Sequence, residues 1–181
     1  QKVQLQTGVI YQASRNDFTY TNIAKENHPV EKQENVQLLQ YGINQSLFIK
    51  PDNKNQFSIK YNYLNSDRNT PKIISATESK ENLIDKLFKG MAEWQRVQQK
   101  SMIYLRVAYL HEELIYSDRL SNLSSDYVVK SLRAQARYKR TFKHGILLVT
   151  SLNLDDDVAI STSYTSQISQ FRTSGLIQLN K

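Results

Sequence analysis

The sequence predicts an α+β fold, in which a curved antiparallel sheet of N-terminal and C-terminal strands packs on one long central helix. Runs that alternate apolar and polar residues occupy both ends of the chain, and such alternation is typical of strands with one buried face. Between them lies a row of apolar residues at helical spacing. The chain has 181 residues, enough to bury a core without disulfides.

A single domain is predicted over residues 1–181. Its three parts are a strand-rich part (1–74), a helical part (75–116) and an antiparallel meander (127–181). In the first part, aromatic and β-branched residues alternate with polar ones and predict strands at 3–11, 17–23, 36–49 and 56–64. Proline, asparagine and clustered charge predict loops at 25–34, 51–55 and 65–72.

The helical part opens with Ser75 and Glu78 at the spacing of a capping box. One helical stripe then follows as far as about Gln99, made of Ile84, Leu87, Phe88, Met91 and Trp94. Residues 102–116 fit either a strand or a helix, and the Glu112-Glu113 pair with no turn residue favours helix. Residues 117–126, rich in Ser and Asn, are expected to be a loop.

The C-terminal part opens with a basic strand over 131–142. Its odd positions are mostly cationic and its even positions mostly apolar, so one face of this strand is expected to be positive. A turn is expected at 143–145, followed by a strand at 146–154, an acidic hairpin tip at 155–157, and strands at 158–166 and 171–179.

The charge pattern predicts an acidic partner. The net charge is +7, and residues 131–181 contribute seven bases against three acids. The candidate partner-binding residues are Arg133, Arg137, Lys139, Arg140 and Lys143. An acidic protein or glycan suits this stripe. Nucleic acid and peripheral contact with a membrane surface are further candidates, and a charge that serves solubility alone is the simplest interpretation.

No catalytic, metal or cofactor pattern is present. Cysteine is absent, which excludes thiol nucleophiles and Cys-based zinc sites. His28, His111 and His144 are scattered, and no nucleophile elbow, phosphate loop or dinucleotide fingerprint occurs. The sequence therefore favours a non-catalytic protein without a cofactor, and an enzyme with scattered catalytic residues is the alternative.

The compartment is predicted to be periplasmic or secreted, since a chain that begins at Gln1 suggests a removed signal peptide, although the cytoplasm stays open. No apolar run approaches the ~20 residues of a spanning helix. An outer-membrane barrel is a further alternative. In it Ile146, Leu148, Thr150, Leu152 and Leu154 would face lipid, with Leu147, Val149, Ser151 and Asn153 inside.

The function predicted first is thus an exported binding or assembly module that docks an acidic protein or glycan through the basic strand. The alternatives are a nucleic-acid-binding module that uses the same bases, or an outer-membrane barrel component. The apolar character of the inner set and the expected charged helix weigh against the barrel.

Overall fold

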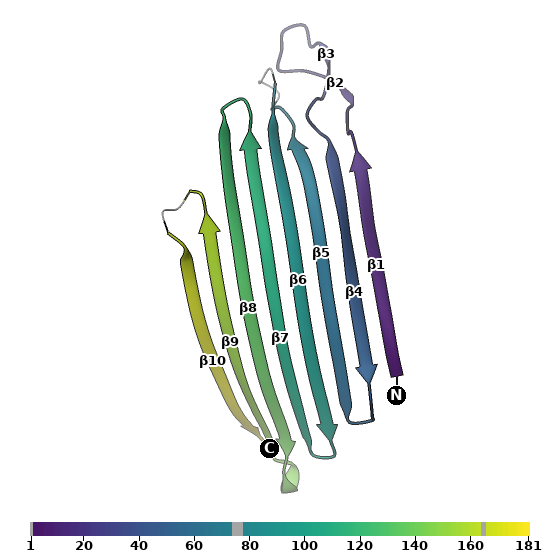
Figure 1. The fold of residues 1–181 in the computed structure, drawn as a ribbon, viewed down its shortest axis with the longest axis vertical. Coiled ribbons are helices and arrows are strands. Elements are labelled where there is room, and N and C mark those ends of the chain that lie inside the picture. The colour runs from purple at the N-terminus through teal and green to yellow at the C-terminus, as the bar shows by residue number, and fades with distance from the viewer. Residues whose placement is uncertain (1, 74–77, 164–165) are drawn as a thin grey trace.

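One large antiparallel sheet of eight strands dominates the computed structural model, which describes residues 2–73, 78–163 and 166–181. Its strand order is β1-β4-β5-β6-β7-β8-β9-β10, so each strand from β4 onward lies beside its neighbour in sequence (Figure 1). The bounds are β1 Lys2–Ser14, β4 Leu38–Lys50, β5 Asn55–Thr70, β6 Glu81–Gln98, β7 Ser101–Asp118, β8 Leu123–Thr141, β9 Leu147–Ser161 and β10 Ile168–Asn180.

A small ribbon stands apart from this sheet. Strands β2 (Thr19–Thr21) and β3 (Val30–Lys32) pair with each other in the connection between β1 and β4, at the upper end of the molecule in Figure 1. At the opposite end, the short 3-10 turn η1 (Lys143–Gly145) joins β8 to β9.

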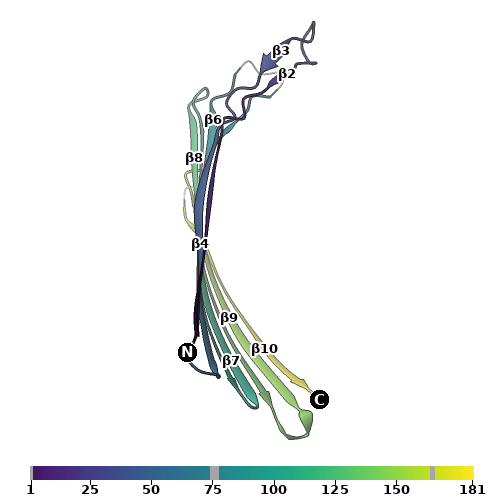
Figure 2. The same ribbon diagram turned by 90° about the vertical axis from the view of Figure 1, so that its right-hand side faces the viewer.

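The sheet is a single twisted layer. Figure 2, turned by 90°, shows no second layer over the middle of either face. Among the described residues no hydrophobic side chain is buried, and most large apolar side chains lie exposed. A layer that buries no apolar core is held together by its backbone hydrogen bonds and by cross-strand side-chain pairs. Both faces of the sheet are therefore free to contact solvent, lipid or another protein.

The predicted central helix is wrong, and with it the α+β class, because β6 occupies residues 81–98 as a strand. The helical spacing arises because Leu87 and Met91 lie on one face of β6 while Ile84, Phe88 and Trp94 lie on the other. Glu78 lies outside any helix, and Ser75 falls outside the described residues.

Three further expectations are corrected. Residues 102–116 are strand within β7, so the helical alternative is wrong. The predicted loops at 65–72 and 117–126 are largely strand, because β5 extends to Thr70 and β8 begins at Leu123. The acidic tip at 155–157 is no tip but the interior of β9, and its carboxylates alternate between the two faces.

Other elements are confirmed. The strands expected near 3–11, 36–49 and 56–64 correspond to β1, β4 and β5, and the basic strand lies within β8. The turn at 143–145, the final strand near 171–179 and the antiparallel meander are also observed. No helix in the described ranges is long and apolar enough to cross a membrane.

Candidate functional site

The register of the sheet divides its side chains into two faces. The side chains of residues paired across antiparallel strands point to the same side of the sheet, and side chains alternate along each strand. One row of partners therefore fixes the side on which all the remaining residues lie. Starting from Tyr109, the partners Gly90 on β6 and Leu132 on β8 share its side. We call the side that carries Tyr109 the apolar face and the opposite side the polar face.

Apolar side chains cover a continuous band on the apolar face. On every strand of the large sheet, the positions that point to the apolar face are mostly aliphatic and aromatic residues. Examples from successive strands are Val9, Ile43, Ile59, Ala92, Val107, Ala134, Leu154 and Ile177. Many of these side chains are exposed, Val9 and Ile177 by 76% and 78%. A contiguous exposed apolar surface of this extent marks contact with another apolar phase or partner.

Polar residues mark both ends of this band, and the two that mark it on one strand are always the same number of positions apart. On four successive strands, one polar residue at each end of the band marks its limit. The pairs are Asn55 and Asn65, Lys86 and Arg96, Ser101 and His111, and Lys130 and Arg140, always ten positions apart. At ~3.4 Å per residue, each pair spans about 34 Å along its strand.

The band runs obliquely across the sheet. Phe88 and His111 are register partners, so one row is apolar on β6 and already polar on β7. At the other end, Arg96 is polar while its partner Ile103 is apolar. The limits on β5 and β6 share their rows, those on β7 and β8 share theirs, and both limits step by two residues between β6 and β7. A step of two residues for every two strands, ~4.8 Å apart, corresponds to a slant of about 35°.

Aromatic side chains gather near both limits of the band. Phe57 and Trp94 stack with ring centroids 6.3 Å apart at one end, and Trp94 donates from Nε1 to Asn55 Oδ1 at 3.2 Å. At the other end Phe88 and Tyr109 lie with centroids 6.3 Å apart. Such amphipathic rings beside polar groups are typical of the boundary between an apolar phase and water.

The middle of the band holds one amide, and its polar atoms are engaged. Gln45 accepts from the Tyr61 hydroxyl at 2.7 Å and donates to the Thr7 hydroxyl at 3.3 Å. The three residues occupy one row over β1, β4 and β5. Lateral pairing of this kind lowers the cost of placing an amide in apolar surroundings.

The polar face carries a charged cluster around Glu93. The Arg106 guanidinium lies 2.7 Å from Oε1, which also accepts from the Tyr104 hydroxyl at 2.5 Å. The Ser58 hydroxyl donates to Oε2 at 2.8 Å, and Lys60 Nζ lies 3.7 Å from the same oxygen. The two strands that flank β6, β5 and β7, thus contribute polar groups to one carboxylate.

A second network links β8, β9 and β10 on the same face. Gln135 donates to Asn153 at 2.7 Å, and Asn153 donates to Ser174 at 3.1 Å. Arg172 pairs with Asp157 at 2.8 Å. These contacts run across the strands, so they brace the sheet from the side that holds its charges.

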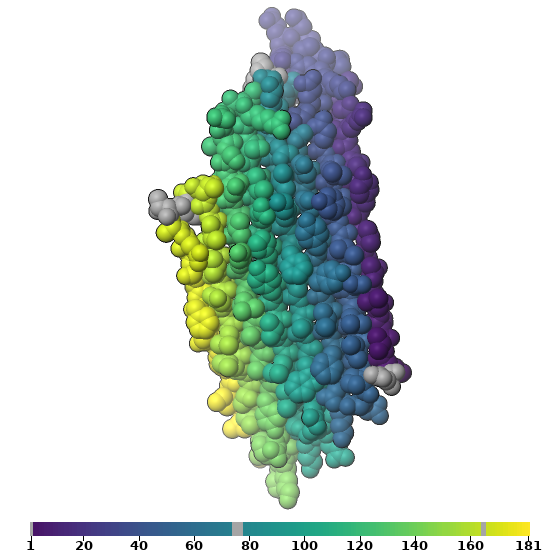
Figure 3. Space-filling view, viewed as in Figure 1, coloured from purple at the N-terminus to yellow at the C-terminus, as the bar shows by residue number. Residues whose placement is uncertain are grey.

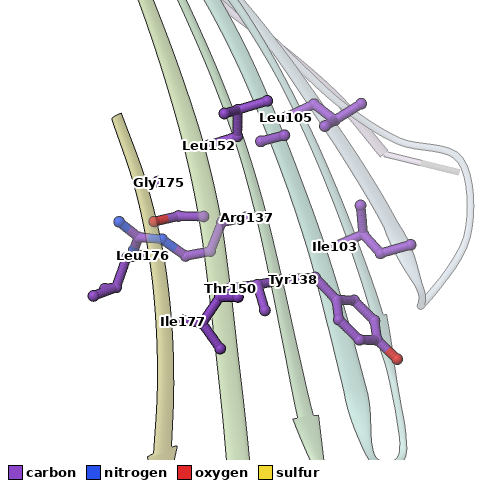
Figure 4. A pocket seen from close by; sticks show the side chains of 11 residues that line it. Ile103, Leu105, Arg137, Tyr138, Thr150, Leu152, Gly175, Leu176 and Ile177 are labelled. Carbon is purple, nitrogen blue, oxygen red and sulfur yellow. The ribbon is translucent and has the colours of Figure 1, made fainter. Parts of the chain in front are cut away.

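The apolar face contains a shallow groove of about 590 Å³ between β7 and β10 (Figure 4). Its lining includes the small residues Ala136 and Gly175, and Ile103, Leu105 and Tyr138 lie along one side. Nearly all of its surface is apolar.

The predicted partner-binding residues do not share one surface. Arg133, Arg137 and Lys139 lie on the polar face of β8, whereas Arg140 lies on the opposite side beyond the apolar band and Lys143 lies in η1. Arg133 has Asp155 at 3.7 Å. The other four residues take part in none of the ion pairs between described residues.

Sequence reasoning missed the two-faced band, although its signal is in the chain. Polar residues recur ten positions apart on segments that otherwise alternate, but only the strand register aligns these segments into one surface. In the described part of the chain, no group of three or more His, Asp or Glu side chains lies close enough to hold a metal ion. No family model and no curated protein matches the chain.

Proposed function

We propose that this sheet is part of the wall of a membrane-spanning protein of the outer-membrane barrel type. Its apolar face would contact lipid and its polar face would line an aqueous interior. The observation that carries the proposal is the oblique apolar band with polar limits ten residues apart.

The dimensions of the band support this assignment. A stretch of about 34 Å along a strand tilted by about 35° rises about 28 Å, close to the thickness of a bilayer's hydrocarbon core. Strands of transmembrane sheets are tilted by ~35–45°, and aromatic residues flank their lipid-facing band. The slant and the rings near Trp94 and Tyr109 fit both properties.

The polar face supports the same assignment from the other side. Its ion pairs, such as that between Arg106 and Glu93, suit an interior with water and a polar lining. A water-soluble sandwich would instead need a second layer on the apolar face, and the sheet itself provides none.

Docking of an acidic partner on the basic strand is the second candidate. Arg137 and Lys139, which enter no ion pair between described residues, favour it. Retention on heparin and on an oligonucleotide across a salt series, with Arg137→Glu as the variant, tests this second function. A retention that neither salt nor the variant changes would contradict it.

The lipid-facing proposal predicts effects of very different size for two neighbouring substitutions on β9. Leu152 lies near the middle of the apolar band, and Ser151 lies next to it on the polar face. We expect Leu152→Arg to weaken folding into phospholipid vesicles by ~2–4 kcal/mol, because an arginine at the bilayer midplane is poorly solvated. Ser151→Arg is the matched control and is expected to change it by less than about 1 kcal/mol.

The measurement is the fraction of folded, vesicle-bound chain as a function of urea concentration, with protection from protease as the readout. Equal losses for the two variants would contradict the assignment of faces. Wild-type chain that stays in the supernatant, as a soluble oligomer with its apolar faces together, would contradict the membrane proposal itself.

A further inference from the structure

The polar face contains a groove that has three basic residues along an otherwise mostly apolar lining. Its volume is about 540 Å³, and it crosses the sheet from β4 to β8 (Figure 3 shows the succession of these strands over the molecule). Three of its lining residues, Lys60, Lys89 and Arg133, are basic, and none is acidic. The remaining polar lining is Asn44, Asn62, Ser46 and Ser131.

The register places the three cations around one short surface. Lys60 and Arg133 lie in the same row with Met91 and Ala108 between them, so their backbones are three strand spacings, about 14 Å, apart. Lys89 lies one strand from Lys60 and two positions along, a diagonal pair within reach of long side chains.

Two of these cations have only a long ion pair, and the third has none between described residues. Lys60 lies 3.7 Å from Glu93, whose Oε1 is closer to Arg106 at 2.7 Å, and Arg133 lies 3.7 Å from Asp155. Lys89 is exposed and enters no ion pair between described residues. The side chains of Lys60 and Arg133 are 39% and 61% exposed, so their charged ends reach solvent.

Small residues keep the floor of the groove open. Ala108 lies in the row that runs from Lys60 to Arg133, and Ser131, also in the lining, is 6% exposed. Lys60 and Lys89 are near enough to repel each other, and an anion with several negative groups would relieve that repulsion and accept hydrogen bonds from the asparagine amides.

We propose that this groove binds a small solute that carries several carboxylate or phosphate groups. This inference rests on the proposed function, because the solute would reach the groove from the aqueous interior that the polar face is proposed to line.

Citrate titrated into the full chain in a zwitterionic detergent tests the inference by calorimetry, with glucose as the neutral probe. We expect citrate to bind, glucose not to bind, and citrate affinity to fall as salt rises. Lys89→Gln and Lys60→Gln are each expected to weaken citrate binding by about fivefold or more. Lys54→Gln, which removes the same charge from the exposed turn between β4 and β5, is the matched control and is expected to leave the affinity unchanged.

Absence of citrate binding, or equal affinity in wild type, Lys89→Gln and Lys60→Gln, would overturn the inference. Circular dichroism of each variant reports whether the sheet persists. Vesicle insertion of the same samples separates the two proposals: insertion without citrate binding contradicts the groove alone, and citrate binding without insertion contradicts the membrane wall alone.

Discussion

Glu31 anchors the ribbon that stands above the sheet. Its carboxylate lies 2.6 Å from Lys25 Nζ and accepts from the Asn22 amide at 3.1 Å and the Tyr20 hydroxyl at 3.2 Å. Lys72 Nζ, from the segment after β5, lies 3.7 Å away. One carboxylate thus ties β2 and β3 to each other and to the end of the large sheet.

These partners lower the pKa of Glu31 to about 2, with the hydrogen bond from Lys25 as the largest cause and that from Asn22 next. The pKa in the folded chain lies below the ordinary value of 4.5, so the stabilisation by this carboxylate is complete above about pH 4.5. It is lost as the pH falls towards 2. The ribbon should therefore open under acid while it is closed at neutral pH.

A carbon-detected NMR titration of the Glu31 carboxyl measures this directly. We expect a midpoint near 2 in the wild-type chain and a higher midpoint in Lys25→Ala, because that variant removes the main cause of the shift. A wild-type midpoint at the ordinary value would show that the contacts around Glu31 do not form in solution.

At the scale of the elements, close packing between strands constrains the first hairpins. A Cβ added at Gly42 on β4 would lie 2.6 Å from the backbone oxygen of Tyr63 on β5. A Cβ at Gly8 on β1 would instead meet the side-chain amide of Asn44, at 2.7 Å. Backbone cannot move aside without disturbing the ladder, whereas an amide can adopt another rotamer.

We therefore expect Gly42→Ala to destabilise the folded sheet by ~1–3 kcal/mol and Gly8→Ala by clearly less. Urea unfolding in detergent, followed by the fluorescence of the single tryptophan, Trp94, gives both values. If the two glycine variants lose equal stability, the close approach of β4 to β5 has no energetic consequence.

The elements also show how far the sequence alone leads. Strands at both ends of the chain could be predicted from alternation, because on β5 Phe57, Ile59 and Tyr61 fall on one side and polar residues on the other. The middle could not, because Leu87 and Met91 place apolar groups on the polar face of β6 and complete a helical stripe.

Length was the second obstacle. β6 and β7 each run for 18 residues without a proline, well beyond the usual strand of about 5–6, and an uninterrupted segment of that length normally indicates a helix. The candidate surface was harder still, since the charges of Lys89 and Arg133 are separated by 44 positions and only the register brings them to one groove.

At the scale of the whole molecule, the two outermost strands of the sheet must find further hydrogen-bond partners if the sheet spans a membrane. β1 and β10 each pair on one side only among the described strands, and they run antiparallel to each other (Figure 1). Unpaired backbone groups are very costly in hydrocarbon, so a sheet that crosses a bilayer must have both edges covered by further strand pairing. The membrane proposal therefore entails that the edge amides of β1 and β10 are hydrogen-bonded in lipid.

The face assignment is the claim on which both proposals depend, and β7 offers a direct measurement of it. The chain contains no cysteine, so single-cysteine variants at successive positions from 103 to 110 carry one spin label each. In phospholipid vesicles we expect labels at Ile103, Leu105, Val107 and Tyr109 to be accessible to oxygen, and labels at the even positions to be accessible to a water-soluble nickel complex. Equal accessibility to the nickel complex along the whole series, or the opposite alternation, would contradict the account.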